Sequence, residues 1–322
     1  MLNRIRAFFN PEQFQGWGKK RSYFEGWYYK IINASETKAF AVIPGLTIDD
    51  GGKRKAFIQL LDGRKKTSEY FTYDGNKFIP RSGKLDISID TNRFREDSLE
   101  LDLPNVKGKL SFVGNIPWPK PIYSPGIMGP FAFVPFMECY HGIVSMDHSI
   151  EGELNVHGEK IDFTDGKGYI EKDWGRSFPS AYVWMQSNHF NQSEISIKAS
   201  VAKIPWIRNS FVGFIAGIWL KDHLIRFTTY NRSRLRKCQI SRDMVELALE
   251  NQTYTLDILA HRDHATELAS PILGAMDGRI EESMTSTIEV TLFNKKTKKT
   301  VFAGIGKNAG LEVAGKIEEI IM

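Results

Sequence analysis

The stretch KLDISID, Lys84–Asp90, places Leu85, Ile87 and Ile89 on one side of an extended chain and polar side chains on the other. This alternation is typical of a β-strand with one buried and one solvated face. Glycine, asparagine and aspartate turn signals separate similar stretches at short intervals. The stretches are Ser98–Leu103, Ser149–Val156, Ser193–Val201, Thr253–Leu259 and Thr285–Leu292. The sequence therefore predicts an all-β protein, a sandwich or barrel of antiparallel strands.

The composition indicates a globular chain. Its 322 residues are 42% hydrophobic and 25% charged, and no apolar run is long enough to span a bilayer as a helix. Cys139 and Cys238 lie far apart and outside any C-x-x-C pattern, which favours a reducing, cytoplasmic location over a disulfide framework. The first ten residues lack the features of a signal peptide. We expect a soluble protein without stable membrane insertion, although transient membrane contact remains open.

The net charge of +5 invites the hypothesis of an anionic partner. The basic residues fall mainly in short runs that resemble hairpin tips, at Lys53–Lys55, Arg64–Lys66 and Lys295–Lys299. No recognition helix, zinc-ligand spacing or RNA-binding strand accompanies them, so nucleic acid is not an expected partner. Gly304–Lys307 faintly resembles a phosphate-binding loop, but no strand-to-helix unit surrounds it.

The chain also repeats itself. Ser145-Met146 and Ser283-Met284 each precede an Ile-Glu pair, a leucine and a Gly-x-Gly, all at one constant spacing. Trp27 and Trp184 open aromatic strands at similar places in the two halves. An internal duplication explains these matches, and chance matching among β-strands is the alternative. The duplication predicts a short extension at 1–19, a first barrel at 20–165 and a second barrel at 166–322.

One segment belongs to neither repeat. Residues 115–138 carry six prolines among several aromatic residues. Proline removes ladder donors, so neither a helix nor a central strand is expected here. The segment is expected to be a rigid loop, either a strap between the halves or a lid over a ligand cavity.

Two aromatic segments also contain polar groups that a simple core would not need. They are Tyr23–Lys30, and Gly168–Gly175 continuing to Trp184–Phe190. Strand alternation places Trp184, Gln186 and Asn188 on one face. Buried carboxamides need partners, so this row favours the wall of a ligand cavity.

These segments resemble the tocopherol cyclase family. The resemblance rests on Phe24–Tyr28, on the Tyr-x-Glu-Lys-x-Trp-Gly of Tyr169–Gly175, on Phe178-Pro179 and on the Trp184-x-Gln186-x-Asn188-x-Phe190 row, and it weakens after Phe190. It implies two lipocalin-like antiparallel barrels related to carotenoid hydratase-type proteins. It also implies the closure of a prenylated hydroquinone to a chromanol without metal or other cofactor. Asp173 and Arg176 replace an asparagine and a glycine of the plant pattern, so the substrate is expected to differ.

Such a cyclisation sets its own chemical demands. An isolated alkene is a weak base, so its protonation needs a neutral acid in a dry pocket. The resulting cation is stabilised by aromatic faces, and the phenol must be held beside it. The candidate acids are Asp173, Glu171 and Asp147. The candidate substrate-binding residues are Glu25, Trp27, Tyr28, Trp174, Trp184, Gln186, Asn188 and His148.

Purely structural roles are an alternative for the same residues. Glu171 and Lys172 could form a buried ion pair, and Asp173 could pair with Arg176. The tryptophans could be core residues, and no histidine has the spacing of a metal ligand. Three functions therefore compete: a cofactor-free cyclase of a prenylated aromatic or isoprenoid, a non-catalytic carrier or sensor of a lipophilic molecule, and an isoprenoid double-bond hydratase.

Overall fold

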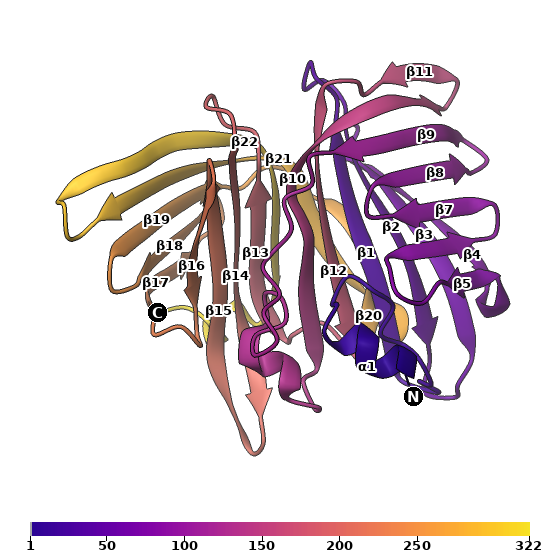
Figure 1. The fold of residues 1–322 in the computed structure, drawn as a ribbon, viewed down its shortest axis with the longest axis horizontal. Coiled ribbons are helices and arrows are strands. Elements are labelled where there is room, and N and C mark those ends of the chain that lie inside the picture. Colours follow the sequence, from indigo (N-terminus) through magenta and orange to yellow (C-terminus); the bar gives the residue numbers. More distant parts are fainter. Residues whose placement is uncertain (1) are drawn as a thin grey trace. The chain divides into compact units, whose positions relative to one another are not determined.

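A computed structural model describes residues 2–322 and divides them into two compact units. The first unit contains the residues up to Phe178 together with Leu268–Arg279. The second contains Pro179–Glu267 and Ile280–Met322. Both are built almost entirely of antiparallel strands (Figure 1), so the all-β prediction is confirmed.

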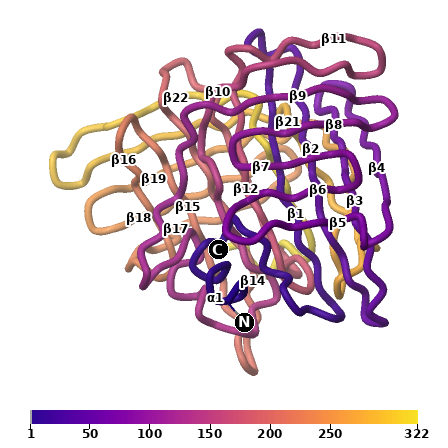
Figure 2. The backbone as a smooth tube through the Cα atoms, turned by 45° about the vertical axis from the view of Figure 1, so that its right-hand side comes forward, coloured from indigo at the N-terminus to yellow at the C-terminus, as the bar shows by residue number. Residues whose placement is uncertain are grey.

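The first unit carries a 12-stranded sheet in the order β4-β3-β2-β1-β12-β10-β9-β8-β7-β6-β5, with β11 paired to β10. Figure 2 shows β9 to β5 following one another in sequence order. The central pairing joins β1 to β12, which lie far apart in the sequence. The bounds are β1 Tyr23–Ile32, β2 Ala39–Ile48, β3 Arg54–Asp62, β4 Thr67–Asp74, β5 Phe78–Pro80, β6 Asp86–Ile89, β7 Asn92–Arg95, β8 Ser98–Asp102, β9 Val106–Val113, β10 Cys139–Val156, β11 Glu159–Asp162 and β12 Gly166–Gly175, with a short 3₁₀ turn η1 at Gly75–Lys77.

Alternation along these strands builds the first core. Trp27, Tyr29 and Ile31 of β1 point to the same side as Ile170 of β12, and all four are fully buried in one apolar cluster. Strands from every part of the sheet contribute to that cluster, including Leu99 of β8. Burial of a large apolar side chain contributes about 1.5–3 kcal/mol, so this shared core is the main stabilising term.

A second, 10-stranded sheet runs in the order β16-β15-β14-β13-β22-β21-β19-β18-β17, with β20 paired to β21. Most of this sheet lies in the second unit, but Leu268–Arg279, which holds most of β20 and the first residues of β21, belongs to the first. The core of the second unit takes Val183 and Met185 from β13 and the alternate residues of the neighbouring strands. Met244–Glu250, the clearest helix-like stretch of the sequence but short enough to be a strand, is strand β18. The bounds are β13 Ala181–Ser187, β14 Ile195–Trp206, β15 Asn209–Leu220, β16 His223–Thr228, β17 Arg234–Ile240, β18 Met244–Glu250, β19 Tyr254–His261, β20 Thr266–Ile272, β21 Ala275–Asn294 and β22 Lys299–Gly315, followed by a 3₁₀ turn η3 at Ile317–Glu319.

The sheets differ from the predicted closed barrels. Among residues 2–322, the hydrogen-bonded path of the first sheet ends at β4 and β5, and that of the second at β16 and β17. The unit boundary also differs from the predicted division at residue 165. Residues 166–175 form β12, which pairs with both β1 and β10, so the first unit continues to Phe178.

The two sheets follow the same strand plan. Strands β1 to β4 and β13 to β16 are successive neighbours, and β1 and β13 each pair with the last long strand of their sheet. Strands β10 and β21 are both irregular at their serine positions, with register shifts at Ser145 and at Ser283. In each strand that serine bonds the residue three places on: His148 Nδ1 lies 3.0 Å from Ser145 Oγ, and Ser286 Oγ donates to Ser283 Oγ at 3.0 Å.

Two segments of the first unit lie outside its sheet. The N-terminal helix α1, Leu2–Phe8, precedes β1 (Figure 1). The proline-rich segment between β9 and β10 is irregular apart from a 3₁₀ helix η2 at Gly129–Phe133, as its prolines predict. Ring contacts join the two segments, with centroids of Phe8 and Phe133 5.3 Å apart.

Candidate functional site

Strand β12 carries the signature residues on two opposite faces. Ile170, Lys172 and Trp174 point to the core side of the sheet, where Trp27 lies opposite Lys172 in register. Tyr169, Glu171 and Asp173 point to the other side. The two faces have different chemistry.

On the core side, a buried ion pair joins β1 to β12. Lys172 Nζ lies 2.5 Å from Glu25 Oε1, and neither side chain is exposed. The ammonium also donates to the carbonyls of Pro11 and Gln13 and lies 4.7 Å from the ring centroids of both Trp27 and Trp174. Burial lowers the pKa of Lys172, while Glu25 acts in the opposite direction.

The carboxylate of Glu25 is equally well satisfied. It accepts the backbone amides of Gln15 and Gly16 at 2.8 and 2.9 Å and the hydroxyl of Tyr23 at 2.6 Å. The indole of Trp27 donates to the carbonyl of Glu12 at 3.0 Å. These contacts fasten residues 11–16 to the sheet. Glu25, Trp27 and Trp174, predicted to bind substrate, therefore form a structural anchor.

The suggested ion pair between Glu171 and Lys172 is not formed, because Lys172 pairs with Glu25 instead. Consecutive residues of a strand point to opposite faces, so Lys172 meets Glu25 across the sheet. The suggested pairing of Asp173 with Arg176 also gives way to another contact. Asp173 bonds His141 of β10, which lies opposite it in register.

The other face of β12 holds a connected set of titratable groups. Nδ1 of His141 lies 2.7 Å from Asp173 Oδ1, and its Nε2 lies 3.5 Å from Glu171 Oε2. Tyr169 donates its hydroxyl to Glu171 Oε2 at 2.5 Å, and the Cys139 thiol lies 3.9 Å from Asp173 Oδ1. We call these five residues the His141 cluster. One imidazole thus hydrogen-bonds Asp173 through Nδ1, while its Nε2, which has no hydrogen-bond partner among the described residues, lies within ion-pair distance of Glu171.

The His141 cluster is largely withdrawn from solvent. The side chains of Glu171, His141 and Asp173 are 6%, 13% and 25% exposed, which leaves Asp173 the most accessible carboxylate. Burial, followed by the charge of Glu171, raises the pKa of Tyr169 well above its ordinary value. Burial and then Asp173 do the same to the pKa of Cys139. Both groups therefore keep their protons at neutral pH and act as donors.

Aromatic residues around the cluster could stabilise a carbocation. Tyr28 lies opposite Glu171 in register on β1, and Gly26 lies opposite Asp173. Tyr28 and Tyr169 are both buried on this face. Phenol rings stabilise a nearby cation by about 0.5–2 kcal/mol.

The same three side chains could present one ligand atom each to a cation. The candidate ligand atoms of His141, Glu171 and Asp173 all lie within 4.8 Å of one another. Imidazole and carboxylate are suitable zinc ligands. However, the 2.7 Å contact between His141 and Asp173 is a hydrogen-bond distance, and a metal on Nδ1 would have to displace that proton.

Asp147 and His148 lie apart from the cluster. His148 pairs in register with Gly168 and His141 with Asp173, which places Asp147 about four residues, roughly 13 Å, further along β12. Asp147 Oδ2 lies 3.9 Å from Lys167 Nζ. His148 is buried against Phe112, with ring centroids 4.6 Å apart, and burial lowers its pKa to about 3. It is a neutral packing residue of the first unit.

Trp184, Gln186 and Asn188 belong to the second unit. Val183 and Met185 enter the core, so Trp184 and Gln186 share the opposite face, as alternation predicts. In register, Trp184 faces Glu312 and Ser200, and Gln186 faces Gly310 and Lys198. A Cβ at Gly310 would lie 2.6 Å from the indole of Trp184, so the glycine makes room for the ring. Asn188 is buried just beyond the end of β13.

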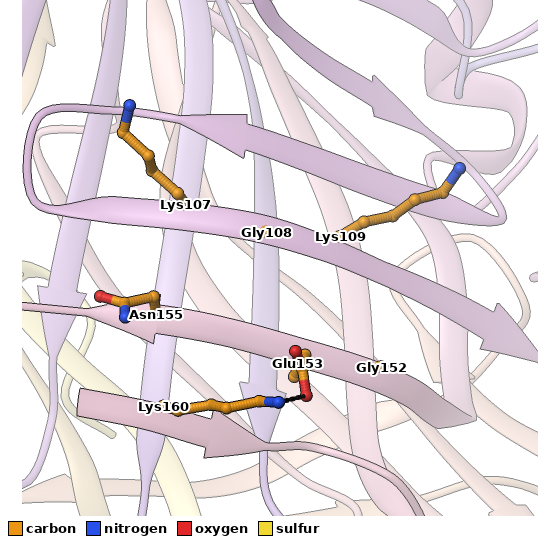
Figure 3. A pocket seen from close by; sticks show the side chains of 7 residues that line it. All are labelled: Lys107, Gly108, Lys109, Gly152, Glu153, Asn155 and Lys160. Atoms are coloured by element: carbon orange, nitrogen blue, oxygen red, sulfur yellow. Dashed lines mark ion pairs between the residues drawn. The ribbon is translucent and has the colours of Figure 1, made fainter. Parts of the chain in front are cut away.

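A surface groove of about 450 Å³ lies elsewhere, on β9, β10 and β11 (Figure 3). Its three lysines are each paired with a carboxylate, for example Lys160 with Glu153 at 2.7 Å. These charges are compensated and exposed, so the groove has the character of a solvated sheet surface. The lining residues are Lys107, Gly108, Lys109, Gly152, Glu153, Asn155 and Lys160.

Sequence reasoning selected Asp173 and Glu171 but missed His141, the residue that links them. His141 stands 32 positions before Asp173 and meets it only through the pairing of β10 with β12. No residue pattern near His141 marked it in the sequence, because its position depends on strand pairing alone.

Comparison with known proteins places this geometry in context. A rice protein (Oryza sativa subsp. japonica) named "Probable tocopherol cyclase, chloroplastic" is 24% identical over 237 residues, which are 57% of this chain and 50% of the rice protein. The chain thus aligns with about half the length of that relative. The structure of CghA with Sch210972 superposes with a TM-score of 0.59 at 11% identity, covering 91% of this chain and 88% of CghA.

An AttH-like protein from Nitrosomonas europaea superposes with a TM-score of 0.53 at 16% identity, covering 91% of this chain and 92% of that protein. At these identities the two superpositions show a shared fold alone. The sequence model described as "Tocopherol cyclase-like" matches residues 114–315, which include β10, β12 and almost all of the second unit's sheet. Because that match covers more than half of the chain, the protein belongs to the tocopherol cyclase-like family.

Proposed function

We propose that this protein is a cofactor-free cyclase of a prenylated hydroquinone or a related isoprenoid, and that the His141 cluster supplies the proton. The observation that carries the proposal is the single imidazole that reaches both Asp173 and Glu171 on a shielded sheet face. The family match, which includes β12, supports the same reading.

The proposed reaction conserves atoms and electrons. A carboxyl group of the cluster donates a proton to the less substituted alkene carbon, and the alkene π electrons form the new C–H bond. The phenol oxygen then attacks the tertiary cation and forms the C–O bond of the ring. The phenol proton returns to the cluster, so the net change is an isomerisation that consumes nothing.

The cluster is arranged to hold and return one proton. Asp173 is the more accessible carboxylate and is assigned the role of proton donor. Glu171 is assigned the role of resupplying that proton through His141. Tyr169 keeps its proton and fixes Glu171 by donating to it. Tyr28 is assigned to the stabilisation of the cation, because it lies opposite Glu171 on the same face.

The proposal also includes the Trp184 row, the internal duplication, the lipocalin-like fold and the cytoplasmic location. The row of Trp184 and Gln186 with Asn188 is a candidate surface for a prenyl or aromatic group in the second unit. A shared strand order and the matching serine positions of β10 and β21 support the proposed duplication. The single core cluster of each sheet supports a lipocalin-like, barrel-like curvature. The free thiols Cys139 and Cys238 suit the proposed cytoplasmic location.

The test is turnover by the purified chain. Incubation with 2-methyl-6-phytyl-hydroquinone, or with a shorter prenyl analogue, should yield a chromanol of unchanged mass. In deuterated water one deuterium should appear on the former alkene carbon. Tight binding without turnover would identify a carrier, and a tertiary alcohol with the mass of added water would identify a hydratase. Either result contradicts the cyclase.

Single substitutions test which carboxyl group donates the proton. Asp173→Asn and His141→Gln should each lower kcat by about 10²–10⁴-fold, the usual contribution of a positioned acid. Asp147→Asn is the matched comparison, because its carboxyl lies roughly 13 Å along the strand. If Asp147→Asn abolishes turnover and Asp173→Asn does not, the proton comes from the other end of β12.

A further inference from the structure

The strongest unexplained feature of the first unit is an apolar surface made by two segments outside the sheet. Helix α1 exposes Leu2 and Ile5, whose side chains are 83% and 57% accessible. The proline-rich segment exposes Ile122 and Tyr123, at 80% and 79%. Phe9, Phe133 and Phe136 are also exposed. Large apolar side chains gathered in this way mark an interaction surface more often than isolated ones do.

Contacts make the two segments one surface. The ring centroids of Phe8 and Phe133 lie 5.3 Å apart, and those of Phe9 and Phe133 lie 6.5 Å apart. Lys120, two residues before Ile122, pairs with Glu12 at 3.0 Å, just after α1. We call the set Leu2, Ile5, Phe9, Ile122, Tyr123, Phe133 and Phe136 the N-terminal apolar surface.

The helix is turned with its apolar side away from the protein. At 100° per residue, Leu2, Ile5 and Phe9 lie within about 60° of one another around the helix axis. The opposite side holds buried Ala7 and Asn3, whose Oδ1 accepts the Ser82 hydroxyl at 2.8 Å. A helix of a water-soluble protein normally buries its apolar stripe, so this orientation calls for an external apolar partner.

Charge identifies the partner. Arg4 and Arg6 are exposed beside the apolar stripe, and across residues 2–322 neither guanidinium forms an ion pair. A twofold contact between two copies would bring like charges together, because each copy would present the same patch. Anionic lipid headgroups would compensate these charges while the acyl boundary accepts the apolar side chains.

We propose that the N-terminal apolar surface docks this protein on an anionic lipid bilayer, with α1 lying in the plane of the interface. Arginine, tyrosine and phenylalanine are the residue types expected at such a boundary. No helix among the described residues is long and apolar enough to cross a membrane, so the proposed contact is peripheral. It stands independently of the proposed reaction, because neither the surface nor its charges include a member of the His141 cluster.

Vesicle sedimentation tests the proposal with the full chain. Wild-type protein should bind vesicles containing about one third phosphatidylglycerol and bind phosphatidylcholine vesicles more weakly. Leu2→Ser/Ile5→Ser should weaken binding to both by roughly tenfold or more. Arg4→Gln/Arg6→Gln should weaken binding to the anionic vesicles by roughly fivefold per arginine, and salt should have the same effect.

Matched controls separate this surface from general stickiness. Ile207→Ser removes a side chain that is 80% exposed in the turn between β14 and β15. Lys296→Gln/Lys298→Gln removes two exposed charges from the turn between β21 and β22. Both controls should bind like wild type. The proposal is overturned if wild type does not bind, if the controls lose as much as the patch variants, or if light scattering shows a dimer that Leu2→Ser/Ile5→Ser dissociates.

Discussion

Replacing Lys172 with methionine should destabilise the first unit by about 3–5 kcal/mol. The substitution keeps an apolar chain between Trp27 and Trp174 but removes the ammonium from a fully buried ion pair. Glu25 would keep its three hydrogen-bond donors but lose its cationic partner, and the carbonyls of Pro11 and Gln13 would lose their donor. Loss of one partner from a buried pair carries a cost of that size.

Native-state hydrogen exchange is the assay, because a two-unit chain need not unfold in one step. The backbone amides of Gln15 and Gly16 donate to Glu25 and report directly on the anchor. Their protection should fall by about 10²–10⁴-fold in Lys172→Met. The double variant with Glu25→Gln should recover about 0.5–3 kcal/mol relative to the sum of the single variants.

The matched control is a surface pair in the same unit. Lys38 lies 2.6 Å from Glu159, but the two side chains are 27% and 52% exposed. Lys38→Met should therefore cost below about 1 kcal/mol. If Lys172→Met costs no more than Lys38→Met, the reasoning about the buried anchor is refuted.

Three further predictions concern the neighbouring residues. His148 has a folded pKa of about 3 against an ordinary value of 6.5, so the unfolded state takes up the proton first as the pH falls. Stability should drop between pH 6.5 and 3, by at most about 5 kcal/mol from this group, and urea titrations of His148→Leu should show a flatter profile there. Gly168→Ala would place a Cβ 2.1 Å from His148 Nε2, so it should lower the free energy of unfolding by about 1–3 kcal/mol, measured by thermal unfolding. Gly26→Ala is the control, because its Cβ would meet only ordinary contacts of 3.6 Å or more. Added Zn²⁺ should inhibit turnover by displacing the proton between His141 and Asp173, and EDTA should restore the rate; activation by Zn²⁺ would contradict this.

Local pattern was enough to predict the strands but not their partners. The alternation in Lys84–Asp90 corresponds to β6, and the stretch Ser98–Leu103 corresponds to β8. Pairing depends on register between distant segments, which alternation leaves undetermined. For that reason the sequence placed residues 166–175 at the start of the second half, whereas β12 lies between β1 and β10 of the first sheet.

The same limit explains which site residues were found. Glu171 and Asp173 are two apart in a strand, so their shared face was predictable from the sequence. By that rule Glu171 and Lys172 had to point apart, and the pairing suggested for them was avoidable. His141 and Glu25 reach β12 from other strands, and only the register of the folded sheet brings them there.

Strand β12 joins the two proposals through its alternation. Lys172, on the core face, fastens residues 11–16 and hence the segment that follows α1. Asp173, the next residue, carries the proposed proton on the opposite face. A single strand thus positions both the segment that follows the proposed docking helix and the proposed acid, at a spacing fixed by the pleat.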